Sequence, residues 1–517
     1  MSKENKRKLV YKSSVIEIIS QFFTAVIALL LRSAFVKYLG IDYVGLNVVI
    51  EDILSMLSLA ELGFQSAIIY RLYKPIANDD YQQINSILSV LKKVYIIIGT
   101  VIIAGGMSLL PFLKGIINNV NVSWNIIYTA FILNLIATAS TYYLGYKRTF
   151  LYANQRQYFI TIVDTISNIG CSLLKVLIII LTNNYILAIS LNLVRNVLVN
   201  LILDKYANNK YPLHINTKEK VDKQLTKGIV RDSKDVLAIK LAIFCYSSID
   251  SLVISRFIGT NTVGYVSNYL TITNNISNIS AKLFASLAPI VSLYLVENSL
   301  EDSYRLLNNY TFVRYAIALI LFIPTFILSN EFISIWIGEQ FIIPNSALLL
   351  FVILLDKYIS MVHGPIVEFD EGLGYFKDIK YVLFIGSIAK LIVSIVGSNV
   401  IGVIGVYLGT AIAQVIFWIG RAKILFTNFF DNHLKKKYWY KQLIYILNII
   451  VTFFACNIVY NLLNLNHSMF SFIVNGFLCV FICFIDIVIV FHKTDEFHYF
   501  LEIALSFVEK VSSRFNR

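Results

Sequence analysis

The sequence predicts an all-α integral membrane protein with about fourteen transmembrane helices, arranged as two pseudo-symmetric six-helix lobes and two further C-terminal helices. Three observations lead to this prediction. Of the 517 residues, 57% are hydrophobic and only 15% are charged, whereas about 25% of an average soluble domain is charged. The apolar residues come in runs of roughly 20 or more, long enough to cross a ~30 Å hydrocarbon core as helices. A short segment near the start of the chain also recurs in its second half.

The first apolar run follows a basic start, Met1 to Lys12. This run is too long for the core of a signal peptide, so we expect it to be the first membrane helix. The alternating polar and apolar strands of an outer-membrane barrel are absent from the sequence. We expect helices near residues 13–37, 43–70, 84–110, 123–146, 157–181, 184–204, 235–257, 263–293, 308–329, 346–367, 377–398, 400–422, 440–464 and 468–491.

One long polar stretch, residues 205–234, divides the first twelve expected helices into six and six. After residue 492, apolar side chains recur on one face of a helix, which is typical of a helix lying on a membrane surface. The predicted organisation is an N-terminal lobe over 1–204, a cytoplasmic basic linker over 205–234, a C-terminal lobe over 235–425, helices 13 and 14 over 426–492, and a cytoplasmic amphipathic tail over 493–517.

The basic residues lie mainly on one side of the expected bundle. The loops of one side hold only Lys37, Lys114 and Arg256. The other side holds the basic clusters within 3–12, 71–74, 92–93, 147–156, 205–234 and 421–441. Because cytoplasmic loops carry the excess of Lys and Arg, both termini are expected in the cytoplasm. This asymmetry accounts for the formal net charge of +13, so no nucleic acid partner is needed.

An internal repeat joins the first and second helices of each six-helix half. Phe35–Gly40 with Val44-Gly45 matches Ile254–Gly259 with Val263-Gly264 at an offset of 219 residues. A looser correspondence links Lys175 to Lys390, each on the fifth helix of its half. Both halves start on the cytoplasmic side, so we expect a parallel repeat, with the substrate path at the repeat interface.

Eight basic residues remain inside the expected helices, where even lenient scales put the cost of a central charge at about 2.5–3.5 kcal/mol. Such residues normally face a water-filled cavity or a partner. The stronger candidates for a substrate-binding cationic cleft are Arg32, Lys175, Arg195, Lys357 and Lys390. Three others lie nearer the cytoplasmic ends, where their side chains can reach the interface, and are weaker candidates: Lys240, Lys282 and Arg314.

Carboxylates inside the helices are candidates for coupling transport to a proton or sodium gradient: Glu61, Asp250, Glu51 and Asp52. Asp356 adjoins Lys357, but successive helix residues point about 100° apart, so we expect these two not to pair.

The excess of intramembrane cations favours an anionic cargo. A diphosphate needs several donors that neutralise it reversibly, and the planar arginine fork suits phosphate oxygens. A hydrophobic drug would need no such set of cations.

Signatures of an enzyme are missing from the sequence. There is no Gly-Lys-Ser/Thr phosphate loop, His-Glu-x-x-His or Gly-x-Ser-x-Gly motif. The six histidines are scattered, and the five cysteines sit in apolar runs without a metal-binding spacing. We therefore expect no catalytic residue, no metal and no cofactor.

Several segments together resemble the bacterial polysaccharide flippases, the Wzx-like branch of the multidrug/oligosaccharidyl-lipid/polysaccharide transporter superfamily. The clearest is Leu57–Pro75, LSLAELGFQSAIIYRLYKP. The other segments are Tyr38-Leu39-Gly40, Tyr43–Leu46, Asp250 with Ile254–Gly259, Ser267-Asn268-Tyr269 and Ile335–Glu339. The resemblance covers nearly the whole chain.

The resemblance implies a MATE-like fold and a polyprenyl-diphosphate-linked oligosaccharide as cargo. It also implies alternating access in the bacterial cytoplasmic membrane, with the prenyl tail remaining in membrane lipid. A polysaccharide polymerase and chain-length proteins are the expected protein partners.

Three alternatives remain open at this point. They are a multidrug or cation antiporter of the same superfamily, a lipid II flippase, and, from another class, a membrane glycosyltransferase or polymerase.

Overall fold

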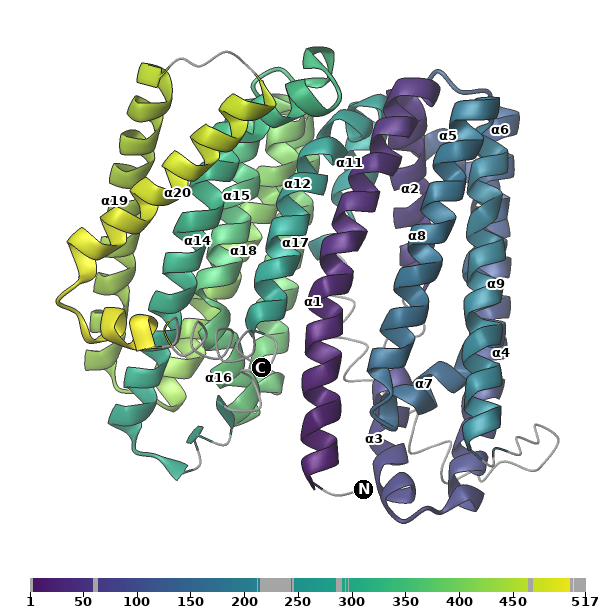
Figure 1. Ribbon diagram of the computed structural model, residues 1–517, viewed down its shortest axis with the longest axis horizontal. Helices are drawn as coiled ribbons and strands as arrows, with labels where there is room; N and C mark the ends of the chain where they lie inside the picture. The colour runs from purple at the N-terminus through teal and green to yellow at the C-terminus, as the bar shows by residue number, and fades with distance from the viewer. Residues whose placement is uncertain are drawn as a thin grey trace. The chain divides into compact units, whose positions relative to one another are not determined.

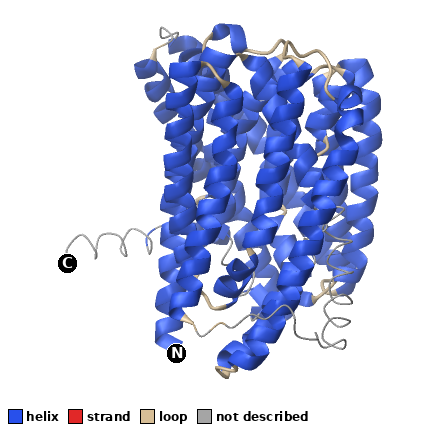
Figure 2. Cartoon of the chain, turned by 90° about the vertical axis from the view of Figure 1, so that its right-hand side faces the viewer, coloured by secondary structure: helices blue, strands red, loops and turns tan. Residues whose placement is uncertain are grey.

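The computed structural model forms two compact units, Met1–Ser267 and Asn268–Arg517. The residues that it describes are helical or form loops (Figure 2). They are 3–58, 64–211, 213, 243, 246–284, 291–292, 294–295, 297–463, 468–502 and 505. Most of the expected linker and the end of the expected tail lie outside them. The division into units does not test the predicted domain bounds, which stay predictions.

The helices of the first unit follow the expected order. They are α1 (Lys3–Ala34), which continues as a π-helical turn (Phe35–Leu39), α2 (Ile41–Leu57), α3 (Phe64–Ala77), α4 (Tyr81–Leu109), a 3₁₀ turn (Leu110–Phe112), α5 (Leu113–Ile116), α6 (Trp124–Leu144), α7 (Tyr146–Ala153), α8 (Gln157–Thr182), α9 (Tyr185–Lys210), α11 (Asp250–Phe257) and the start of α12 (Thr260–Phe284).

The second unit contains the remainder of α12 and the longest helix of those described. Its helices are α14 (Leu300–Trp336), a 3₁₀ turn (Glu339–Phe341), α15 (Ser346–Val362), α16 (Gly364–Leu373), α17 (Phe376–Ile401), α18 (Val403–Asn428), α19 (Asn432–Leu463) and α20 (Met469–Phe491).

Ten of the described helices are long and apolar enough to cross a membrane, or eleven if α15 and α16 form one span with a 42° bend. The all-α, multi-pass prediction is thus supported at this coarser level, and the count of about fourteen stays a prediction. The expected helix 43–70 corresponds to α2 and α3, with residues 59–63 outside the described part. The expected helix 235–257 is described mainly from residue 246 onwards.

Polar side chains cap several of these helices where the sequence passes from a loop into an apolar run. Asp80 accepts a hydrogen bond from the backbone N–H of Gln83 at 2.9 Å, and Asn184 accepts one from that of Leu187 at 3.0 Å. Such caps satisfy backbone donors that the first helical turn leaves unpaired. A reciprocal capping box between Ser468 and Ser471 starts α20 in the same way.

Corresponding helices have the same neighbours in the two units. In the first, α4 packs on α6, α6 on α9, and α9 on α8. In the second, α14 packs on α15, α15 on α18, and α18 on α17. Within each unit these helices run alongside one another (Figure 1). The third, fourth, sixth and fifth expected helices of each half therefore pack in the same order, as an internal repeat requires.

The two copies of the repeated segment meet at their matched glycines. A Cβ atom on Gly45 would lie 3.0 Å from the Gly264 nitrogen and would collide with the Thr260 carbonyl oxygen. A Cβ atom on Gly264 would lie 2.5 Å from the Ile41 carbonyl oxygen. Ile41 and Thr260 are themselves equivalent positions of the repeat, so each copy makes the same contact on the other. Reciprocal contacts of this kind are typical of two elements related by a two-fold axis.

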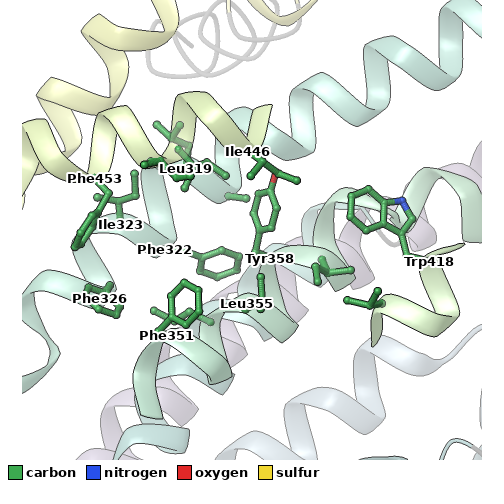
Figure 3. Close-up of a pocket in the computed structure, with 16 residues that line it drawn as sticks. Leu319, Phe322, Ile323, Phe326, Phe351, Leu355, Tyr358, Trp418, Ile446 and Phe453 are labelled. Carbon is green, nitrogen blue, oxygen red and sulfur yellow. The ribbon is translucent and has the colours of Figure 1, made fainter. Parts of the chain in front are cut away.

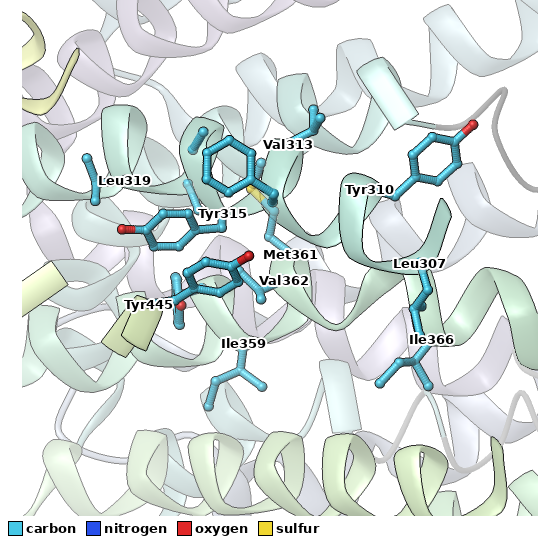
Figure 4. Packing of buried hydrophobic residues seen from close by; sticks show 14 of the residues in the cluster. Leu307, Tyr310, Val313, Tyr315, Leu319, Ile359, Met361, Val362, Ile366 and Tyr445 are labelled. Carbon is cyan, nitrogen blue, oxygen red and sulfur yellow. The ribbon is translucent and has the colours of Figure 1, made fainter. Parts of the chain in front are cut away.

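Aromatic residues hold the two C-terminal helices against α14. The rings of Tyr315 on α14 and Tyr445 on α19 stack with centroids 4.3 Å apart (Figure 4). The ring of Phe491 on α20 packs on Tyr315 in a T-shaped arrangement with centroids 5.7 Å apart. Tyr315 donates a hydrogen bond to Asn448. Because lipid tails are as apolar as these side chains, close packing and interhelical hydrogen bonds, rather than exclusion of water, stabilise this region.

Candidate functional site

Three predicted site residues line one cavity in the first unit. The cavity has a volume of about 220 Å³, and Arg32 of α1, Glu51 of α2 and Lys175 of α8 contribute its charged side chains. Asn47 also lines it and donates a hydrogen bond to Glu51 Oε1 at 2.8 Å. The charges of Arg32 and Lys175 both act on the Glu51 carboxylate. The cavity therefore combines two cations with one acid.

A series of hydrogen-bonded amide side chains orients Lys175. Its Nζ donates to Asn192 Oδ1 at 2.5 Å, and Asn192 Nδ2 donates to Asn134 Oδ1 at 3.1 Å. Asn134 is buried, and its Nδ2 donates a hydrogen bond to the Ala130 carbonyl at 3.0 Å. The ammonium is thus oriented by neutral groups, which leaves its positive charge available to a ligand.

Arg195 of α9 lies close enough for its charge to act on Lys175. Its Nη1 donates to Asn196 Oδ1 at 3.4 Å, and its buried Nε has no hydrogen-bond partner. The structure thus brings together three of the five stronger candidates, Arg32, Lys175 and Arg195. Their role in binding stays a prediction.

Two hydrogen bonds cross between the copies of the repeat in the first unit. Arg32 Nη1 on α1 donates to Ser267 Oγ on α12 at 2.9 Å, and Ser251 on α11 donates to Asp52 on α2. Ser251 occupies the position in the second copy that Arg32 occupies in the first. The charge of Asp250 also acts on Asp52, so these two candidate coupling acids are neighbours.

The second unit has a polar cavity of its own, with a volume of about 340 Å³. Its charged lining consists of Arg314 of α14, Lys357 of α15 and Glu368 of α16. Hydroxyl and amide groups of α12 complete the polar wall, among them Ser277, Asn278 and Ser280. Two of the predicted binding residues, Arg314 and Lys357, are therefore brought together here, although Arg314 had the weaker signal in the sequence.

Arg314 is tightly enclosed and only 7% exposed. It donates a hydrogen bond to Glu368 and lies over the Phe284 ring, with its central carbon 4.2 Å from the ring centroid. Its Nη1 also donates to the Met361 carbonyl at 3.4 Å. A Cβ atom on Gly364 would collide with the guanidinium group, so a glycine at the start of α16 makes room for it.

The expectation that Lys357 and Asp356 do not pair is wrong. Lys357 Nζ lies 3.5 Å from Asp356 Oδ2. Although the two Cα–Cβ bonds diverge on the helix, the flexible four-carbon lysine stem brings the ammonium back to its neighbour. Lys357 thus enters the cavity with an adjacent carboxylate.

The remaining predicted residues lie elsewhere. Lys390 is fully buried in α17, and its backbone carbonyl lies against Gly409 of α18. Lys282 is half-buried in the last turn of α12. Glu61 and Lys240 lie outside the described residues. Neither Lys390 nor Lys282 lines the two polar cavities.

A second, almost entirely apolar cavity adjoins the polar one in the second unit. Its volume is about 480 Å³, and α14, α15, α18 and α19 supply its aromatic and aliphatic walls (Figure 3). Phe322 lines both cavities. Lys357 faces the polar cavity, whereas the next residue, Tyr358, faces the apolar one. The second unit can therefore accommodate charged and apolar groups side by side.

Neutral polar residues and one acid were missed in the sequence. Asn47, Asn134 and Asn192 lie within apolar runs. A polar amide in such a run is itself a signal of a polar site, but a search for charged residues alone does not detect it. Glu368 follows the Gly364-Pro365 pair beyond the expected end of its helix. Among the described residues, no group of His, Cys, Asp and Glu could hold a metal ion.

Comparison with solved structures reveals the fold. The chain is similar to the lipid II flippase MurJ in an inward closed conformation, with a TM-score of 0.67, 16% identity, and coverage of 92% of this chain and 98% of that one. It is also similar to an inward-facing multidrug resistance MATE family transporter of the MOP superfamily, with a TM-score of 0.63, 15% identity, and coverage of 81% and 99%. A mutant of the Vibrio cholerae MATE transporter VcmN gives a TM-score of 0.55, 14% identity, and coverage of 84% and 100%.

These similarities confirm the expected MATE-like fold of a multi-pass integral membrane protein. No curated protein matches the chain significantly. A family model described as "Polysaccharide biosynthesis protein" matches residues 10–295, more than half of the chain. That the chain acts as a transporter rather than an enzyme stays a prediction. With this match over the first unit and the beginning of the second, the chain belongs to the polysaccharide biosynthesis protein family.

Proposed function

We propose that this protein is a flippase that moves a polyprenyl-diphosphate-linked oligosaccharide across the bacterial cytoplasmic membrane for surface polysaccharide biosynthesis. The observation that carries the proposal is the adjoining pair of cavities in the second unit. The cargo combines an anionic, hydroxyl-rich head with a long apolar chain. Arg314 and Lys357 offer donors to the head, and the apolar cavity beyond Phe322 offers a surface to the chain.

The first unit supports the same cargo class. Arg32 and Lys175 can donate hydrogen bonds to phosphate oxygens, and such charge-assisted bonds are about twice as strong as neutral ones. Asn47 can donate to sugar hydroxyls or accept from them. We propose alternating access, in which these cavities open first to one side of the membrane and then to the other.

Coupling to a proton or sodium gradient is proposed for the acids beside the cations. Glu51 lies in the cavity with Arg32 and Lys175, so its charge competes with an anionic ligand for these side chains. A proton or a cation bound to Glu51 would compensate its negative charge and so weaken its competition with the ligand for Arg32 and Lys175. Glu61, Asp250 and Asp52 remain further candidates.

The experiment that tests the proposal measures transport in proteoliposomes. A fluorescent polyprenyl-diphosphate disaccharide is incorporated, and its transfer between leaflets is followed with an impermeant quencher. We expect protein-dependent transfer that Lys175→Gln and Lys357→Gln each reduce at least about tenfold, because each removes a charge that faces a cavity.

The matched control is Lys423→Gln, which removes an exposed lysine on α18 that lines neither polar cavity. It should transport at the wild-type rate. Transfer that no lysine replacement affects would contradict the assignment of the cationic cavities. Complete lack of transfer by the wild-type protein would contradict the flippase itself.

A lipid II flippase is the second candidate, because the MurJ structure covers 92% of this chain whereas the two MATE structures cover 81% and 84%. Lipid II also presents a diphosphate and a polyprenyl chain, so the cavities suit it equally. The two candidates separate in cells. Restored growth after depletion of the resident lipid II flippase would favour lipid II, and restored surface polysaccharide in a flippase-deficient strain would favour the first proposal.

A further inference from the structure

Each cation of the polar cavity in the second unit is already paired with a carboxylate of the protein. Arg314 donates to Glu368, and Lys357 Nζ lies 3.5 Å from Asp356 Oδ2. Two positive charges thus face two negative charges. An anionic ligand entering this cavity meets cations whose charge is already compensated.

The two partners of the Arg314–Glu368 pair are held very differently. Arg314 is fixed on several sides, by the Phe284 ring, the Met361 carbonyl and the backbone at Gly364, although its buried Nε has no hydrogen-bond partner. Glu368 is held through one oxygen by Arg314, and its buried Oε2 has no hydrogen-bond partner. A buried acceptor without a partner carries a desolvation cost of about 1–3 kcal/mol. Of the two, the carboxylate is therefore the partner that can leave.

We propose that Glu368 is a resident counter-ion, which the diphosphate of the cargo displaces from Arg314 and which thereby keeps cargo binding reversible. The inference rests on the proposed function for the chemical class of the cargo. A transporter must release its ligand, and a carboxylate tethered beside the same guanidinium competes at a high effective concentration. Glu368 is thus a positioning residue that tunes affinity by holding Arg314 until the ligand arrives.

The displacement also has a consequence for α16. This short helix carries two carboxylates that pair with two different long helices, Glu368 with Arg314 of α14 and Asp370 with Arg421 of α18 at 3.8 Å. Only the first pair lines the cavity. When the ligand takes Arg314, α16 loses its ionic contact with α14 and keeps that with α18, so ligand binding changes how the bent end of the α15–α16 span is held.

The test compares Glu368→Gln with Asp370→Asn in the purified full-length protein. Both replacements remove one negative charge from α16 and preserve side-chain shape, but only Glu368 faces the cavity. Titration calorimetry with geranyl diphosphate, and separately with inorganic pyrophosphate, measures affinity. We expect Glu368→Gln to bind both ligands at least about tenfold more tightly than the wild type, and Asp370→Asn to bind them as the wild type does.

A double-mutant cycle separates competition from a merely structural role. Arg314→Gln should weaken binding, and adding Glu368→Gln to it should bring no further gain, because the competed group is gone. A gain of the same size with and without Arg314 would overturn the proposal. The proposal would also be overturned if the wild type binds geranyl diphosphate and Glu368→Gln binds it equally well or more weakly. That outcome leaves the flippase proposal intact.

A measurement on the wild type covers the case in which Glu368→Gln does not fold. Carbodiimide labelling of carboxylates, read by mass spectrometry, should increase at Glu368 when pyrophosphate saturates the protein and stay constant at Asp370. Unchanged labelling at Glu368 would overturn the proposal. If neither ligand binds the wild type by calorimetry, the proposed cargo class fails, and this inference fails with it.

Discussion

Lys175 shows how a charged side chain inside a membrane protein is oriented without being neutralised. Its Nζ is bound by a neutral amide, Asn192, which in turn is bound to Asn134. A carboxylate in place of Asn192 would have neutralised the ammonium directly. Glu51, which lines the same cavity, acts on the charge of Lys175 instead. The residue is therefore oriented by hydrogen bonds whereas its charge remains directed at the cavity.

This arrangement predicts the effect of Asn192→Leu. The replacement keeps a side chain branched at Cγ but removes the acceptor of Lys175 and the donor to Asn134. We expect transport in the proteoliposome assay to fall several-fold, with the melting temperature lowered only slightly, since interhelical hydrogen bonds in membranes average about 0.6 kcal/mol.

Ser190→Ala is the control for Asn192→Leu. Ser190 lies on the same helix, and its hydroxyl donates to the Leu187 carbonyl of that helix. It should transport as the wild type does. Equal loss in both variants would show that α9 as a whole, and not the amide chain, is sensitive to substitution.

Among the elements, α2 and α12 depend on close backbone approach at one point. Gly45 and Gly264 each face the backbone of the other copy of the repeat, and neither position leaves space for a Cβ atom. Small residues allow such approach between membrane helices. Small residues also bring α17 and α18 together: Gly405 packs on Gly397 and Gly409 on Ser394 of α17, whereas Gly402 lies between the two helices at φ +63°.

The reciprocal contact predicts that Gly45→Ala and Gly264→Ala have similar effects. Each adds a methyl group against backbone atoms that cannot move aside, and overpacking of this kind costs about 1–3 kcal/mol. We expect both variants to show a lower melting temperature in detergent, by comparable amounts.

Gly170→Ala is the control for the glycine pair. Gly170 lies within α8, and no atom outside its own helix would contact a Cβ there. Because alanine favours a helix over glycine by about 0.8–1.0 kcal/mol, this variant should match or exceed the stability of the wild type. Wild-type stability in both Gly45→Ala and Gly264→Ala would refute the close approach.

For the whole molecule, the distribution of charge predicts orientation. The basic residues are expected to concentrate on one side of the bundle, which the positive-inside rule assigns to the cytoplasm. The four cysteines that the structure describes are all buried. Single exposed cysteines can therefore report which side of the membrane a loop faces.

We expect Lys114→Cys to react with an impermeant maleimide added to intact cells and Lys423→Cys to react only after lysis. Both lysines are exposed in the structure. Cys245 is replaced by alanine in both variants to remove background, and mass spectrometry measures labelling. The opposite pattern would reverse the predicted topology.

At the scale of the whole molecule, the positions of most helices could be predicted from the sequence, whereas their bends and breaks could not. Apolar runs alone gave the bounds of several helices closely: α8 spans Gln157–Thr182 against the expected 157–181, and α20 spans Met469–Phe491 against 468–491. The α15–α16 bend and the short helix α7 were not predicted. Hydropathy averages over about one span, so it does not detect where a helix bends or breaks within an apolar run.

The sequence by itself determined the membrane class, the family resemblance, the internal repeat and the set of buried cations, because each depends on residue type and spacing along the chain. Only the tertiary structure decided which cations share a cavity. Arg32 and Lys175 line the same cavity although 142 positions separate them. Lys390, their expected companion, is buried in helix packing. Arg314 faces a cavity with its own carboxylate partner. The rotation of each helix about its axis and the neighbours it packs against determine these outcomes, and neither is contained in the pattern of a single helix.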